Sequence, residues 1–191
     1  MIDKKEFSEM RKELEQRDET REKVIAQSRE IITLSKQAIY AVHRKDLSTG
    51  VKKLADMKKQ VLALQKIDIS LDTNMATVAY QEYAEAAAYV HFAEKGVLVS
   101  RKALGIDGES YLMGLCDLTG ELMRKAVDDI INKNYEHAYK IRELVTLIYG
   151  EFLQFNLRNG ELRKKSDQIK WNLQKVEDLI YDVEMKKRPS K

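Results

Sequence analysis

The near absence of proline is the feature that most limits the folds open to this chain. Its 191 residues contain one proline, Pro189, and eight glycines that are scattered and form no linker. Proline punctuates sheets and loops and breaks helix interiors, so a chain of this length almost without it is typical of an all-helical protein. Apolar residues make up 43% of the chain, which is enough for a core, and charged residues make up 34%, which favours long solvent-facing helices.

Hydrophobic periodicity and capping residues divide the chain into six main helices. The predicted helices cover about residues 4–44, 51–67, 74–95, 108–133, 135–155 and 161–187, with a turn at 68–73 and a less regular short helix at 98–104. The first twenty residues are almost all charged and are expected to project from the body, and residues 188–191 are expected to form a disordered tail. We therefore predict one domain over residues 1–191, an all-α bundle of six to seven antiparallel helices.

Several classes of protein are disfavoured by composition. The single cysteine, Cys116, excludes an intramolecular disulfide and a Cys-rich zinc site, and its apolar neighbours predict a core residue. The net charge of +3 is too small to indicate nucleic-acid binding by itself, so a basic footprint must be local. The N-terminus lacks an apolar signal region and no window reaches the about 18 apolar residues of a membrane span. We expect a soluble, cytoplasmic protein with no membrane partner.

Four acidic residues interrupt helix faces that are otherwise apolar. Glu82 and Glu85 share a face with Val78, Tyr89 and Phe92 of the helix at 74–95. In the helix at 108–133, Asp117 and Glu121 are four residues apart on the only polar stripe. An ionised carboxylate in a core is costly unless it is paired or binds a metal ion. If the two stripes face each other, four carboxylates converge.

Such a cluster predicts a Mg²⁺ or Mn²⁺ site, because carboxylate oxygens are the ligands that these hard cations prefer. Metal-assisted displacement at phosphorus uses clusters of this kind. The alternatives are ordinary solvated or salt-bridged glutamates, with Arg124 as a partner of Glu121, and a ferritin-like di-metal oxidase. The oxidase is disfavoured because it requires Glu-x-x-His motifs, and none of His43, His91 and His137 follows a glutamate at that spacing.

Three segments of the chain resemble the translin family, which includes translin and translin-associated factor X. They are residues 17–44, residues 81–92 and, as the most specific, YLMGLCDLTGELMR at residues 111–124. The tail at residues 155–183 resembles translin more closely. The resemblance covers nearly the whole chain in the same order and spacing.

The resemblance implies an all-α fold of about seven helices and a closed, barrel-shaped oligomer, an octamer in this family, that encloses RNA. It also implies roles for Glu82, Glu85, Asp117 and Glu121, which match the acidic set of the metal-dependent endoribonuclease translin-associated factor X. Translin itself lacks the full set and is the RNA-binding subunit. A chain with the full set and a translin-like last helix is expected to form a homo-oligomer in which every subunit is catalytic.

The leading expectation is therefore a Mg²⁺- or Mn²⁺-dependent endoribonuclease that cleaves single-stranded or short duplex RNA inside an oligomer. The alternatives are a non-catalytic protein that binds single-stranded RNA or DNA, and a helical scaffold without a nucleic-acid role. RNA binding requires phosphate neutralisation, and the candidate residues, which are otherwise solvated helix charges, are Arg124, Lys125, His91, Lys95, Arg29, Lys36 and Arg44.

The last predicted helix carries an apolar seam at 3-4 spacing, and we expect this seam to form part of a subunit interface. Its members are Leu162, Ile169, Leu173, Val176, Ile180 and Val183. Four aromatic residues nearby are expected to pack in the core or between subunits, namely Tyr149, Phe152, Phe155 and Trp171.

Overall fold

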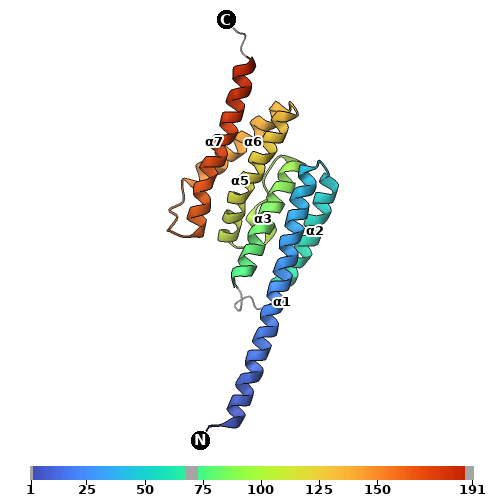
Figure 1. The fold of residues 1–191 in the computed structure, drawn as a ribbon, viewed down its shortest axis with the longest axis vertical. Helices are drawn as coiled ribbons and strands as arrows, with labels where there is room; N and C mark the ends of the chain where they lie inside the picture. The colour runs from blue at the N-terminus through green and yellow to red at the C-terminus, as the bar shows by residue number, and fades with distance from the viewer. Residues whose placement is uncertain (1, 68–72, 188–191) are drawn as a thin grey trace.

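The computed structural model describes residues 2–67 and 73–187, and in these ranges it contains helices and no strands. The helices are α1 (Lys4–His43), α2 (Leu47–Leu64), α3 (Thr73–Lys95), α4 (Arg101–Leu104), α5 (Gly108–Ile131), α6 (Tyr135–Phe152) and α7 (Glu161–Lys187) (Figure 1). The predicted all-helical class is confirmed. The predicted tail at 188–191, and the predicted turn at 68–73 except for Thr73, lie outside the described residues.

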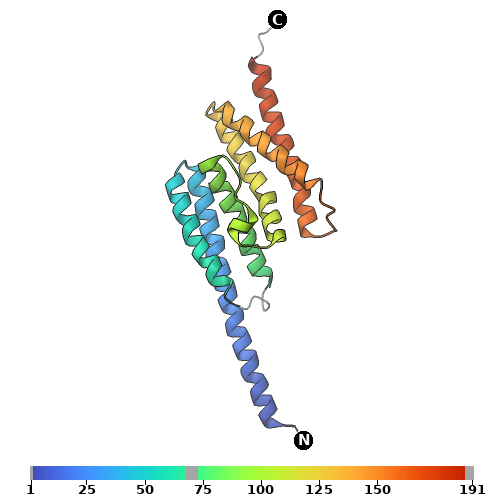
Figure 2. The same ribbon diagram turned by 180° about the vertical axis from the view of Figure 1, so that it is seen from behind.

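The helices form a bundle with α3 and α5 at its centre. α3 packs against α1, α2 and α5, and α5 packs against α3, α6 and α7. The N-terminal part of α1 extends away from the bundle, as both views show (Figures 1 and 2). The first buried residue of α1 is Val24, so the predicted projection of the charged N-terminal stretch is present.

Side-chain caps set the helix starts, and one predicted start is wrong. The Asp46 carboxylate accepts from the backbone N–H of Thr49 at 3.0 Å, so α2 begins at Leu47, where we had expected a break up to Gly50. Asp107 caps α5 in the same way, accepting from the N–H of Ser110 at 2.8 Å. The short helix α4 begins only after Ser100, which caps it, and ends at Gly105 with φ of 69°.

Small residues bring α3 and α5 into close contact at the level of the acidic residues. A Cβ atom on Gly114 would lie 2.6 Å from Cβ of Ala84, 2.6 Å from the carbonyl oxygen of Gln81 and 2.9 Å from the backbone nitrogen of Glu85. Only glycine fits at this crossing, which fixes the distance between the two acidic stripes.

The apolar seam of α7 is buried within the chain, so its prediction as a subunit interface is wrong. Ile169 and Val176 are fully buried, and α7 packs on α5 and α6. Of the four aromatic residues near this end, Phe152 is buried, while Phe155 and Trp171 are 45% and 64% exposed.

Cys116 is buried as predicted, and burial raises the pKa of its thiol to about 12. Among the described helices, none is long and apolar enough to cross a membrane.

Candidate acidic site between α3 and α5

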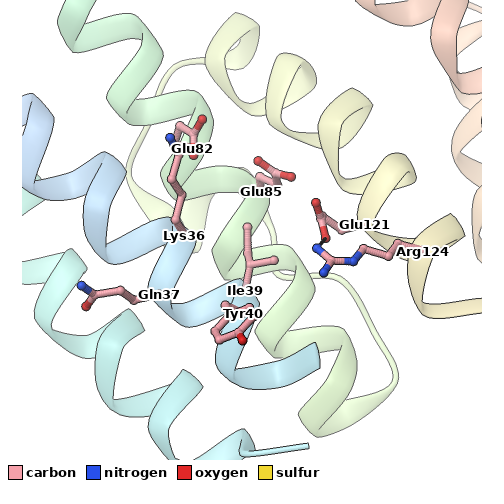
Figure 3. A pocket seen from close by; sticks show the side chains of 8 residues that line it. All are labelled: Lys36, Gln37, Ile39, Tyr40, Glu82, Glu85, Glu121 and Arg124. Atoms are coloured by element: carbon pink, nitrogen blue, oxygen red, sulfur yellow. Dashed lines mark ion pairs between the residues drawn. The ribbon is translucent and has the colours of Figure 1, made fainter. Parts of the chain in front are cut away.

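A pocket of about 590 Å³ opens where α1, α3 and α5 meet (Figure 3). Three of the four predicted acidic residues line it, Glu82 and Glu85 from α3 and Glu121 from α5. The other lining residues are Lys36, Gln37, Ile39, Tyr40 and Arg124. The fourth acidic residue, Asp117, lies one turn before Glu121 on α5 and faces the start of α7.

Glu85 is the most buried of the four carboxylates, at 8% exposure. Burial, followed by the charges of Asp117, Glu82 and Glu121, raises its pKa to about 8. The four carboxylates therefore repel one another, as two facing acidic stripes require. Glu85 has more negative charge around it than the protein's own cations compensate.

Glu82 lies at the edge of the same site. Burial is the main cause of its raised pKa, and the charge of Asp117 adds to it. Ser35 and the ammonium group of Lys36, both from α1, act in the opposite direction. The hydroxyl of Ser35 also donates to the backbone oxygen of Glu82 at 3.1 Å, which ties α1 to α3 at this point.

Asp117 is held by two side chains from other helices. Nζ of Lys165 on α7 lies 2.6 Å from one carboxylate oxygen and 2.7 Å from the other. The amide of Gln81 on α3 also donates to Asp117. Both oxygens of this carboxylate thus have a donor within the chain.

Glu121 is held in a similar way by a histidine from α1. Nε2 of His43 lies 2.5 Å from its carboxylate, and Arg124 contributes a longer ion pair at 3.8 Å. The hydroxyl of Tyr89 lies 3.2 Å from Nδ1 of His43 and so orients the ring. Burial, with Glu121 as the next cause, raises the pKa of Tyr89, which keeps its hydroxyl protonated as a donor.

The donor set fits a hard divalent cation in its chemistry, because it consists of carboxylate oxygens that line a pocket. In the side-chain positions shown, however, no three Asp, Glu, His or Cys groups within residues 2–67 and 73–187 converge closely enough to bind one ion. The contacts above explain this: Asp117 points to Lys165, and Glu121 points to His43.

The predicted RNA-binding residues separate into two groups. Lys36 and Arg124 line the acidic pocket. Lys125 instead forms ion pairs with Asp128 and Asp129, and His91 contacts the backbone oxygen of Val97.

The three remaining candidates do not line this pocket. Lys95 pairs with its neighbour Glu94 at 3.7 Å, and Arg44 lies 5.7 Å from the centre of the Tyr40 ring. Arg29 is exposed on α1.

Among the side chains that contact Asp117 and Glu121, Gln81, His43 and Lys165 were not predicted from sequence. A signal for Lys165 was present: it lies three residues after Leu162 and four before Ile169, so it occupies a position in the apolar seam of α7. A lysine in such a position requires a partner, just as Glu85 does in α3. The partner itself could not be identified, because it lies 48 residues away on another helix.

Comparison with known proteins agrees with the fold and identifies related chains. The profile of the translin family matches residues 19–187. The rat translin-associated protein X (Rattus norvegicus) is 25% identical, over 94% of this chain and 78% of its own length. Human translin (Homo sapiens) is 32% identical over 52% of this chain and 50% of its own.

Two solved structures share the fold over almost the whole chain. The crystal structure of apo-NeC3PO has a TM-score of 0.85 and 25% sequence identity, covering 95% of this chain and 97% of its own. The structure of the AfC3PO–duplex RNA complex also has a TM-score of 0.85, at 22% identity, covering 95% and 98%.

Proposed function

This chain belongs to the translin family, and from that premise we propose that it is a metal-dependent endoribonuclease that acts on RNA within an oligomer of its own copies. Glu82, Glu85, Asp117 and Glu121 are the proposed ligands of Mg²⁺ or Mn²⁺. The complex of a structural neighbour with duplex RNA supports RNA as the ligand.

The observation that carries this proposal is the burial of Glu85 beside three other carboxylates. A protein gains nothing in stability from such a cluster, and perturbed carboxylates that line a pocket are typical of functional sites. A divalent cation at this site would relieve the repulsion among the four groups.

Each part of the site has a role in this proposal. Lys36 and Arg124 at the pocket would neutralise the RNA phosphate. The acidic residues would hold the ion, and the ion, when bound, would activate a water molecule and offset charge on the phosphate. His43, fixed by Tyr89, would orient Glu121.

The test is cleavage of labelled single-stranded RNA and of a short duplex, with Mn²⁺ and with EDTA. We expect cleavage only with Mn²⁺ and a loss of at least about 100-fold in the variant Glu121→Gln. The matched control is Glu109→Gln, an exposed residue of the same helix, which should retain activity. Equal cleavage in EDTA, or full activity of Glu121→Gln, would remove the catalytic assignment.

A second candidate function is RNA binding without cleavage. It is favoured by the internal partners of Asp117 and Glu121, since Lys165 already pairs with Asp117 and His43 already contacts Glu121. RNA binding by fluorescence anisotropy, together with intact RNA after long incubation in Mn²⁺, would support this function over the nuclease.

A further inference from the structure

Lys165 forms an ion pair that differs from an ordinary surface pair. Its Nζ contacts both oxygens of Asp117, and both side chains are about three-quarters buried, at 26% and 23% exposure. The adjacent Lys164 is 74% exposed and pairs with Glu161 on its own helix. Lys165 instead joins the first turns of α7 to the acidic stripe of α5.

The charge of Lys165 acts on more of the site than Asp117 alone. It opposes the raised pKa of Glu85 and also that of Glu82. One ammonium group thus partly offsets three of the four carboxylates that are the proposed metal ligands. It does so from a position in an otherwise apolar seam.

We propose that Lys165 is an internal counter-ion that competes with the divalent cation for Asp117 and so sets the metal affinity of the site. The inference rests on the proposed function, because it requires that the acidic site binds such an ion. Because the ammonium group contacts both oxygens of Asp117, it repels a divalent cation that approaches either oxygen, and Lys165 is expected to move away when the ion binds. The observed affinity is then lower than the four carboxylates alone would give.

The test is Mn²⁺ binding without RNA, measured from the EPR signal of free Mn²⁺, for the wild type, Lys165→Met and the control Lys164→Met. Removing a charge from beside the ligands should tighten Mn²⁺ binding roughly 10-fold in Lys165→Met. The control removes an equally charged neighbour that contacts no acidic residue of the site, and should leave the affinity unchanged.

Thermal unfolding gives an independent readout. In EDTA, Lys165→Met should unfold at a lower temperature than Lys164→Met, because Asp117 loses its ammonium partner, and Mn²⁺ should raise the melting temperature of Lys165→Met by more than that of the wild type. If Lys165→Met does not fold, Lys165→Gln keeps a hydrogen-bond donor beside Asp117 without the charge and should show the same tightening.

The outcomes separate the two proposals. If the wild type binds Mn²⁺ and the Lys165 variants bind it with unchanged or weaker affinity, the counter-ion proposal is overturned and the proposed metal site remains. If the Lys165 variants bind Mn²⁺ and the wild type does not, the counter-ion proposal is supported most strongly. No binding by any of these proteins would overturn both proposals.

Discussion

At the scale of single residues, the candidate site is a set of charges that the protein only partly compensates. Asp117 has an ammonium partner and Glu121 a histidine partner within hydrogen-bonding distance, while Glu85 is buried among carboxylates. This difference sets Glu85 apart from the other carboxylates of the site. It also makes Glu85 the residue at which stability and the proposed function conflict most directly.

The pKa of Glu85 predicts how stability changes with pH in the absence of metal. The folded-state pKa of about 8 lies above the ordinary value of 4.5, so folding favours the protonated form. The stabilising effect of that proton is complete below pH 4.5, decreases between pH 4.5 and 8, and is lost above pH 8.

We therefore expect Glu85→Gln to match the wild type in unfolding free energy at pH 4.5 and to exceed it at pH 8.5, by at most about 5 kcal/mol. Denaturant unfolding in EDTA at the two pH values measures this. Glu94→Gln, an exposed residue of the same helix, is the control and should show no such trend. A difference between Glu85→Gln and the wild type that stays constant with pH would contradict the assignment.

Residue spacing predicted the acidic set but not its partners. Glu82 and Glu85, like Asp117 and Glu121, share a helix face at 3- or 4-residue spacing, which is a local property of the sequence. The contact of His43 with Glu121 joins residues 78 positions apart. Such a pairing depends on how the helices pack, and no local pattern in one sequence carries that information.

At the scale of helices, the contact of α3 with α5 positions the site. Glycine at 114 and alanine at 84 let the two backbones approach, and the acidic residues extend from the helices on either side of that crossing. Helix identity and most helix boundaries followed from periodicity and caps. The role of the α7 seam did not follow from the sequence, because an apolar stripe has the same residue pattern whether it packs within one chain or between two.

The glycine at this crossing gives a sharp test of the packing. Gly114→Ala places a methyl group against the backbone of α3, and we expect it to cost about 1–3 kcal/mol or more of stability and to reduce Mn²⁺-dependent cleavage. Gly120→Ala on the same helix meets only Asn172 at 3.8 Å and should be neutral or stabilising by up to about 1 kcal/mol. Chemical denaturation of both variants measures the difference, and equal effects would show that the crossing is not tight.

At the scale of the whole molecule, one chain leaves apolar side chains uncovered. Large apolar residues are exposed around the end of α6 and along α7, namely Leu153, Phe155, Trp171 and Tyr181. Phe7, Met10 and Leu14 are exposed on the projecting part of α1, which precedes the segment that matches the family profile. These surfaces are consistent with the proposed oligomer.

The proposed oligomer predicts the size of the particle in solution. Light scattering should give a mass several times the 22.2 kDa of the chain, the same in EDTA and in Mn²⁺, since the acidic site lies within one subunit. A mass near 22.2 kDa would contradict RNA cleavage inside an assembly and would leave the fold unaffected.

The most direct test of the account is the position of manganese in a crystal, located by its anomalous scattering. We expect a peak between α3 and α5, with carboxylate oxygens of Glu85 and at least one of Asp117 and Glu121 at about 2.0–2.2 Å. We also expect Lys165 to have moved away from Asp117 wherever Asp117 is a ligand. Crystals grown in saturating Mn²⁺ with no peak among these carboxylates would contradict the central claim.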